Sequence, residues 1–186
     1  MKIRDKNHRR NHWLKKPMFS QQYRPWLIDD GSLTARLQQR YTDFSVKKVS
    51  LKCAKPLQDE ARLLKHPPHQ QALIREVLLM GNNEPVVFAH SVLPRVALRG
   101  PWNKLGRLGN KPLGATLFAN PKVKRTPLAF KKLSRHHPLY MRAAQHLLKP
   151  PAYLWARRSI FSLNTASQKC ANILVTEIFL PQILNK

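Results

Sequence analysis

The chain has 186 residues, of which 42% are hydrophobic, so it is long enough to form one domain around a core. Its 34 Lys and Arg residues outnumber 9 Asp and Glu residues, which gives a formal net charge of +25 at pH 7 and attracts polyanions, anionic lipid and anionic metabolites. The sequence contains no run of about 18 apolar residues, which a membrane-spanning helix would need.

The beginning of the chain is strongly basic. Residues 1–16 carry seven Lys and Arg residues and one acidic residue, Asp5. No apolar run follows that would form the core of a secretory signal peptide. We expect residues 1–20 to form a flexible basic arm and residues 21–186 to form the folded domain.

The first predicted elements of the domain are a helix and a strand. Ser32 follows a turn cluster and can cap a helix that runs from Leu33 to Tyr41. Residues 46–53 alternate polar with apolar side chains, which is the period of a strand with one solvent-exposed face. We expect Cys53 to be buried in that strand. With only two cysteines in the chain, a reducing cytoplasm is the expected location.

A short helix at residues 59–64 precedes the clearest hairpin of the sequence. This hairpin pairs residues 73–80 with residues 85–92 across a turn at residues 81–84. Strand alternation places Arg75 on the same face as its apolar neighbours. An always-charged guanidinium therefore projects into apolar surroundings.

Residues 94–127 are punctuated by Gly and Pro, and they predict loops with short helical pieces. Loops that are held by a rigid sheet often carry binding groups. Residues 128–150 are basic and helical at best, for example over residues 139–148. No strand is predicted in this part of the chain.

A second hairpin pairs residues 157–163 with residues 171–180 across a turn at residues 164–169. Glu177 is the only acidic residue after position 85, and alternation places it among apolar side chains. Strands that pair through hairpins predict an α+β fold, a single domain with an antiparallel sheet flanked by helices.

Arg75 and Glu177 share one property, a charge that faces an apolar interior. Burying a charge is costly unless a partner or a ligand compensates. The two residues therefore allow two interpretations: they line a pocket for a small anion, or they form a structural ion pair that closes the core.

Other motifs carry little weight. Residues 106–109 match the G-x-x-G clamp of a KH domain, but Pro112 interrupts the helix that should follow. The sequence lacks the glycine-rich motifs that cradle phosphates. His66 and His69 lack the Cys or carboxylate companions of a metal site, so we expect no metal.

Four segments, in matching order from position 26 to position 181, resemble the chorismate lyase family, the chorismate-pyruvate lyases of ubiquinone biosynthesis. These segments are WLIDDGSLT at residues 26–34, LIREVLL at residues 73–79, KPLG at residues 111–114 with Leu117 and Phe118, and LWARRS at residues 154–159 leading to TEIFLP at residues 176–181.

The resemblance implies a lyase without a cofactor that converts chorismate to 4-hydroxybenzoate and pyruvate. It also implies that Arg75 holds the ring carboxylate and that Glu177 meets the ring hydroxyl. Backbone N–H groups at Leu33 and Leu113 are expected to complete the carboxylate site. Two of these four residues, Arg75 and Glu177, are the ones that polarity had already singled out.

The resemblance leaves open which cation binds the second carboxylate of chorismate. Arg157, Arg158 and a lysine near position 111 are the candidates. The protonation state of Glu177 also stays open, because apolar surroundings raise the pKa of a carboxyl group whereas nearby positive charge lowers it.

The predicted enzyme is a cytoplasmic monomer whose pocket lies between the sheet and the loops around Leu33 and Leu113. Its partners would be chorismate and 4-hydroxybenzoate, with non-specific contact to polyanions or anionic membranes through the basic surface. The alternative is a nucleic-acid binding module that uses the charge of +25. Salt separates the two functions, because polyanion binding weakens steeply as ionic strength rises.

Overall fold

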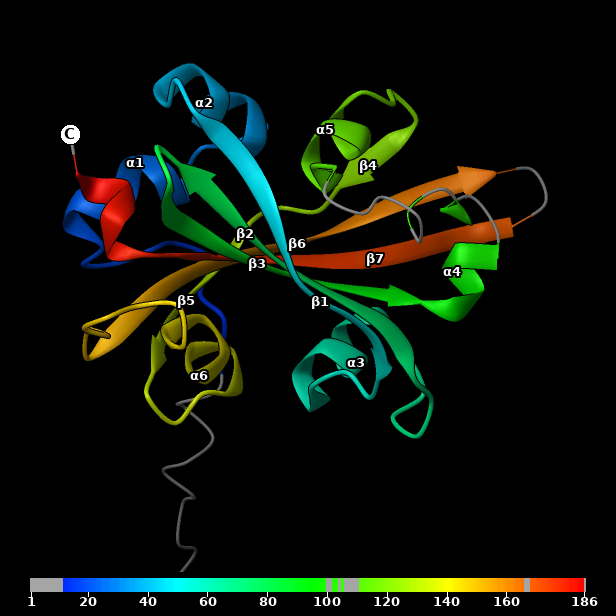
Figure 1. Ribbon diagram of the computed structural model, residues 1–186. Coiled ribbons are helices and arrows are strands. Elements are labelled where there is room, and N and C mark those ends of the chain that lie inside the picture. Colours follow the sequence, from blue (N-terminus) through cyan, green and yellow to red (C-terminus); the bar gives the residue numbers. More distant parts are fainter. Residues whose placement is uncertain (1–11, 100–101, 104, 106–110, 166–167, 186) are drawn as a thin grey trace, which may run out of the picture.

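The computed structural model describes residues 12–99, 102–103, 105, 111–165 and 168–185 (Figure 1). A seven-stranded sheet forms its centre, with the order β1-β2-β3-β7-β6-β4, and β5 pairs with β6 beside this path. The strands are β1 (Phe44–Ala54), β2 (Ala72–Gly81), β3 (Glu84–Pro94), β4 (Val123–Arg125), β5 (Ala129–Ser134), β6 (Tyr153–Thr165) and β7 (Gln168–Phe179). Neighbouring strands are antiparallel. The predicted α+β fold with an antiparallel sheet is confirmed.

Helices cover both faces of this sheet. The α-helices are α1 (Arg24–Leu27), α2 (Leu33–Arg40), α3 (Gln58–Leu64), α4 (Arg95–Arg99), α5 (Leu113–Phe118) and α6 (Pro138–Ala144), and the 3-10 helices are η2 (Gln21–Tyr23) and η4 (Pro181–Leu184). Figure 1 shows α2 and α5 on one side of the sheet and α3 and α6 on the other. No helix in the described ranges is long and apolar enough to cross a bilayer.

Both predicted hairpins are present. At the turn between β2 and β3, Asn82 and Asn83 have φ values of 49° and 66°. Two successive residues with positive φ match the twist of the flanking strands, and Asn tolerates this conformation better than most residues. The second hairpin, formed by β6 and β7, extends into the predicted turn at residues 164–169, and residues 166–167 lie outside the described ranges.

The predicted capped helix is α2. The Ser32 hydroxyl accepts a hydrogen bond from the Ala35 N–H at 3.4 Å, which satisfies one of the orphan donors of the first turn. Leu33 and Leu37 are buried and belong to the same apolar cluster as Val77 of β2. Burial of this apolar stripe fixes α2 against the sheet.

The expectation of helix at best for residues 128–150 is wrong at its beginning. Residues 129–134 form β5, which pairs with β6, and α6 covers residues 138–144. Phe130 and Leu133 are buried, whereas Lys132 is exposed. The pairing with a distant strand, rather than the local pattern, determines the structure here.

The expectation that Cys53 is buried is also wrong, because its free thiol is exposed. β1 lies at one end of the sheet, and its register with β2 shifts between Lys48 and Ser50. An extra residue in one strand changes the alternation of the faces. Val49 and Leu51 on this strand are consequently 38% and 39% exposed.

Part of the expected basic arm lies against the domain. Leu14 forms a β-bridge with Phe130, and the indole N–H of Trp13 donates to Oδ2 of Asp59 at 3.1 Å. The remainder of the arm, residues 1–11, and the G-x-x-G segment at residues 106–109 lie outside the described ranges. The boundary between arm and domain at residue 20 stays a prediction.

The sheet face that carries α3 and α6 contains a buried polar cluster. Nδ1 of His90 lies 3.0 Å from Oε1 of Glu76, and its Nε2 lies 3.2 Å from Oε1 of Glu60. Arg142 donates to the same oxygen of Glu76 at 2.8 Å. Burial alone lowers the pKa of His90, but the two glutamates outweigh burial and raise this pKa above its ordinary value.

Candidate active site

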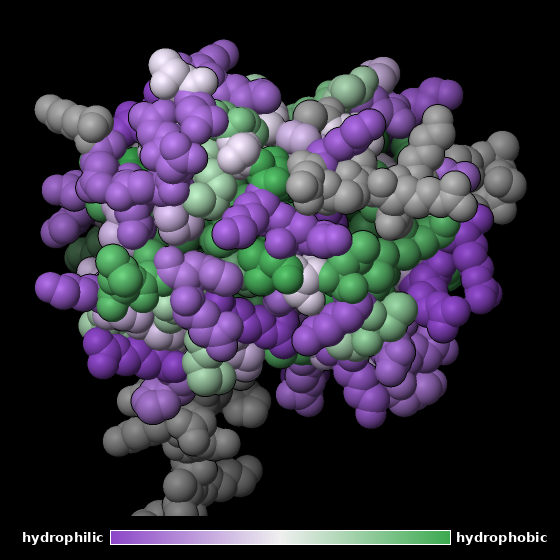
Figure 2. Space-filling view, viewed as in Figure 1, coloured by the Kyte–Doolittle hydropathy of each residue, from purple (hydrophilic) through white to green (hydrophobic). Residues whose placement is uncertain are grey.

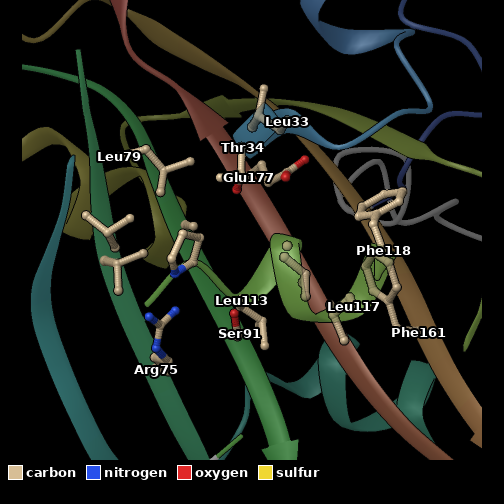
Figure 3. Close-up of a pocket in the computed structure, with 16 residues that line it drawn as sticks. Leu33, Thr34, Arg75, Leu79, Ser91, Leu113, Leu117, Phe118, Phe161 and Glu177 are labelled. Atoms are coloured by element: carbon tan, nitrogen blue, oxygen red, sulfur yellow. The ribbon is translucent and has the colours of Figure 1, made fainter. Parts of the chain in front are cut away.

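A cavity lies between the sheet and the helices α2 and α5 (Figure 3). Its lining is mostly apolar, with the polar side chains of Thr34, Arg75, Ser91 and Glu177, a composition typical of small-ligand pockets. The cavity itself has a volume of about 40 Å³. The total space between the surrounding atoms, which includes the opening to solvent, is about 500 Å³. A cavity that binds benzene measures about 150 Å³. A ring-sized ligand therefore requires the residues that line the cavity to move apart.

Arg75 lies at one end of this cavity. Alternation along β2 points its side chain toward α5, and only 3% of the residue is exposed. Its Nη2 donates a hydrogen bond to the carbonyl oxygen of Lys111 at 2.8 Å, just before α5 begins. Burial lowers the pKa of Arg75, although a guanidinium stays charged under ordinary conditions. The arginine is a sheltered cation whose orientation is fixed by the start of α5.

Glu177 lies on β7, and Arg157 of the neighbouring β6 is its partner. Nε of Arg157 donates to Oε2 of Glu177 at 2.5 Å. Arg157 is fully buried, and its Nη1 also donates to the carbonyl oxygens of Trp26, at 2.8 Å, and of Asp29. Within the described ranges, Oε1 of Glu177 accepts no hydrogen bond. One oxygen of the carboxylate is thus fixed while the other remains available.

Arg75 and Glu177 do not pair with each other, so the interpretation of a structural ion pair between them does not hold. The strand β3 separates them, with Ser91 opposite Arg75 and Ala89 opposite Glu177. Two strand spacings of about 4.8 Å and two residues of about 3.4 Å along the strands place their Cα atoms about 12 Å apart. The cation and the carboxylate mark two separate positions in one cavity.

Leu33 and Leu113 are the first residues of α2 and α5, and both line the cavity. The N–H groups of a first helical turn have no acceptor within the helix, so they are available to an anionic ligand. The two helices approach closely, because a Cβ atom added at Gly114 would lie 3.1 Å from Oγ1 of Thr34. Gly114 therefore permits the contact between the two walls of the cavity.

Two candidates for a second cation are already engaged elsewhere. Arg157 binds Glu177 and backbone carbonyls, as described above. Arg158 projects from the opposite face of β6, where Nη1 donates to Oδ2 of Asp59 at 2.7 Å and the guanidinium lies 4.0 Å from the Trp13 ring centre. Neither arginine lines the cavity.

Arg125 of β4 was missed by the sequence reasoning. Its Nε donates to Oγ of Ser159 and its Nη1 to the carbonyl oxygen of Asp30, both at 2.8 Å. Its Cζ lies 5.4 Å and 5.3 Å from the ring centres of Phe118 and Phe161, which line the cavity. The acceptors are 34 and 95 residues away in the chain, so no local pattern indicated the role of this arginine.

Comparison with known proteins decides the family. The sequence profile described as chorismate lyase matches residues 9–186, which is nearly the whole chain. The chain belongs to the chorismate lyase family. The four predicted site residues, Arg75, Glu177, Leu33 and Leu113, thus line one cavity in a member of this family.

Curated members of the chorismate lyase family support the assignment over most of the length. A probable chorismate pyruvate-lyase from Methylobacillus flagellatus is 46% identical over 175 residues, which cover 94% of this chain and 96% of that protein. A second protein of the same name, from Nitrosospira multiformis, is 51% identical over 162 residues and is matched over 87% of each chain.

Solved structures similar to this chorismate lyase family member include a GntR-family transcriptional regulator from Bacillus cereus, with a TM-score of 0.54 and 12% identity over 75% of this chain and 92% of that one. The effector domain of PhnF from Mycobacterium smegmatis has a TM-score of 0.53 and 14% identity, over 80% of this chain and 88% of that one. At such low identity the likeness concerns the fold alone.

Proposed function

We propose that the protein is a chorismate-pyruvate lyase, which converts chorismate to 4-hydroxybenzoate and pyruvate as the first committed step of ubiquinone biosynthesis. The family and the names of the curated relatives support this function. The observation that carries it is the cavity that holds Arg75 and Glu177 at separate positions, each with its own partner.

In this proposal Arg75 binds the carboxylate on the ring. A guanidinium matches the geometry of a carboxylate with two parallel N–H donors, and each charge-assisted hydrogen bond contributes about 1.5–3 kcal/mol when water is excluded. The backbone N–H groups of Leu33 and Leu113 complete this carboxylate site. Because the two N–H groups begin the two helices that form the cavity walls, a bound carboxylate would connect α2 with α5.

Glu177 meets the hydroxyl on C4, at the other end of the ring. Because Arg157 binds Oε2, the hydroxyl on C4 donates its hydrogen bond to Oε1 of Glu177. The fixed carboxylate then determines the direction of this hydrogen bond. Glu177 forms no covalent bond in this mechanism. Its role is to orient the ring and to guide the movement of the proton at C4.

The reaction itself requires little chemical assistance. The hydrogen on C4 leaves as a proton, the ether bond between C3 and oxygen breaks, and the departing enolpyruvate takes up a proton at its methylene carbon to become pyruvate. The ring becomes aromatic, which makes the elimination favourable. The protein contributes by folding the enolpyruvyl arm over the ring and by excluding water.

Substitution of the two assigned residues tests this function. Arg75→Ala and Glu177→Ala are each expected to lower kcat/KM by roughly a hundredfold or more, because they remove charge-assisted contacts in a dry cavity. Production of 4-hydroxybenzoate and pyruvate in equal amounts is the measurement. Matched controls are Arg99→Ala and Glu84→Ala, which remove the same charges from exposed positions.

The outcome is read only for variants that remain folded, as circular dichroism and a cooperative thermal transition show. Wild-type rates in both cavity variants would refute the assigned roles. A purified wild-type protein that releases no pyruvate from chorismate would refute the function itself.

We further propose a monomer in the cytoplasm that makes non-specific contacts with polyanions or anionic membranes. The exposed free thiol of Cys53 suits a reducing compartment. The charge of +25 disfavours self-association and favours anionic surfaces. These contacts accompany the enzymatic function and do not replace it.

A further inference from the structure

The proposed substrate carries two carboxylates, and the residues assigned so far account for only one of them. This inference therefore rests on the proposed function. With the ring carboxylate at Arg75 and the C4 hydroxyl at Glu177, the position of the second carboxylate follows from chemistry. The enolpyruvyl ether is attached to C3, the neighbour of C4, so the arm leaves the ring at the Glu177 end of the cavity.

This position excludes the remaining lysine candidate. Lys111 is exposed, and its carbonyl oxygen is bound by Arg75, so it belongs to the opposite end of the cavity. Arg157 is engaged by Glu177, and Arg158 lies on the other face of the sheet. A cation at the Glu177 end has to come from another element.

Arg125 does not line the cavity itself, but it lies directly behind two lining residues at that end, Phe118 and Phe161. It pairs with Phe161 across β4 and β6, and its guanidinium lies over the rings of Phe118 and Phe161. These rings contact each other edge to face, with centres 5.8 Å apart, and Figure 3 shows both beside the cavity, away from Arg75. The positive charge of Arg125 is close enough to Glu177 that the carboxylate favours the charged guanidinium.

Two of the three nitrogen atoms of the Arg125 guanidinium donate hydrogen bonds, which fix the orientation of the group. Nε and Nη1 are held by Ser159 and Asp30, which set the plane of the group. Nη2 donates no hydrogen bond within the described ranges. Arg125 is half-buried, and this burial lowers its pKa. A partly buried, oriented donor suits a carboxylate ligand better than a mobile surface lysine does.

We propose that Arg125 binds the carboxylate of the enolpyruvyl arm and thereby distinguishes substrate from product. The aromatic pair of Phe118 and Phe161 forms the apolar wall beside which the arm folds. After the elimination this carboxylate departs with pyruvate. 4-Hydroxybenzoate has no group for Arg125, so the arginine stabilises the bound substrate and leaves the affinity for the product unchanged.

Paired measurements on Arg125 variants test the proposal. Arg125→Gln is expected to lower kcat/KM for chorismate by about tenfold to a hundredfold, mainly through KM, because one charge-assisted contact is lost. Its Kd for 4-hydroxybenzoate should stay within about twofold of the wild-type value, since the product makes no such contact. Arg125→Lys keeps the charge and should recover part of the loss.

The control is Lys124→Gln, which removes the same charge from the next residue of β4, where the side chain is exposed. It should leave both constants unchanged. A parallel loss of affinity for 4-hydroxybenzoate in Arg125→Gln and Arg125→Lys would overturn the proposal, because it would assign the arginine a purely structural role through Ser159 and Asp30.

An unchanged KM in the folded variants would also overturn the proposal while leaving the lyase function intact. If Arg125→Gln does not fold, the comparison of KM and product Kd in Arg125→Lys decides. A wild-type protein that releases no pyruvate would refute the lyase function, and this inference with it.

Discussion

Arg157 joins two parts of the cavity that are far apart in the chain. Its Nε holds Glu177 on β7, and its Nη1 binds the carbonyl oxygens of Trp26 and Asp29, just before α2. Any outward movement of the segment before α2 therefore loosens the arginine that orients Glu177. Opening of the cavity for the substrate and the orientation of the Glu177 carboxylate therefore depend on the same arginine.

Arg157→Lys tests this coupling. Lysine keeps the charge but cannot bind the carboxylate and the carbonyls with one rigid fork. We expect kcat to fall by about tenfold and the free energy of unfolding to fall by about 1–3 kcal/mol. Steady-state kinetics and urea denaturation measure the two effects.

Arg158→Lys is the matched control, because Arg158 serves only the opposite face of the sheet. It should lower stability by a similar amount and leave kcat unchanged. Equal values of kcat in the two variants would contradict the orienting role of Arg157.

Alternation alone singled out Arg75 and Glu177, because each is the charged member of an apolar face, but it left a ligand pocket and a structural ion pair equally open. Arg157 could not be distinguished from Arg158 in this way. A six-residue turn at residues 164–169 would pair residue 163 with 170, and residue 157 with 176. The irregularity between Leu163 and Thr165 shifts the register by one residue, so Arg157 lies opposite Glu177.

Among the elements, α6 begins at an unusual cap. Nδ1 of His137 accepts a hydrogen bond from the Leu139 N–H at 3.2 Å, which requires a neutral ring. Burial, together with the positive charge of Lys131, lowers the pKa of His137 to about 4. The lowered pKa keeps the ring neutral near neutral pH, which is the form that can accept the cap hydrogen bond.

The pH dependence of stability follows from this shift. A histidine whose pKa is lower in the folded state stabilises the protein above its unfolded pKa, near 6.5, and the stability is lost as pH falls toward 4. We expect the wild type to lose about 1–2 kcal/mol over this window from His137, after allowing for solvent screening. His137→Ser keeps a side-chain acceptor at the cap but does not titrate.

Urea denaturation at several pH values between 6.5 and 4 measures the difference between the two proteins. A carboxyl group with a lowered pKa that does not interact with His137, such as Glu76, affects both proteins alike and cancels in the comparison. His136→Ser, at an exposed neighbouring position, should keep the wild-type pH profile. Identical profiles for the wild type and His137→Ser would show that the cap does not control the effect.

The elements themselves were predictable to different degrees. Both hairpins, α2 and α3 follow from turn chemistry and periodicity within a few residues. β5 does not, because Lys131 is buried near Asp59 and the Trp13 ring, which lie far away in the sequence. A lysine normally indicates a solvent-exposed position, so Lys131 hides the strand from a reading of the local sequence. Its burial is explained only by partners that are distant in the chain.

For the whole molecule, the distribution of the few acids explains the basic surface. Five acids, Asp29, Asp59, Glu60, Glu76 and Glu177, form ion pairs with Arg or His. Several of these pairs are buried, so the negative charge serves internal contacts. The exposed side chains consequently present mainly Lys and Arg to the solvent, and Figure 2 shows hydrophilic residues over much of one face.

Added salt should weaken binding of polyanions to the basic surface but should change catalysis in the cavity little. Retention on a sulphated polysaccharide is expected to weaken steeply between about 50 and 200 mM salt, because condensed counterions compete for the same surface. The kcat for chorismate should change little over this range, since the bound substrate is sheltered. A kcat that falls together with retention would place the reacting groups in contact with bulk solvent.

The open end of the sheet has a further consequence. β1 carries the exposed residues Lys47, Lys48 and Lys52, and the shift near Val49 bends its outer margin. A second molecule that added its own β1 there would bring two rows of ammonium groups together along an uneven border. Crowded solutions of the enzyme should therefore resist the strand-by-strand growth that leads to fibrils, even with apolar side chains exposed beside these lysines.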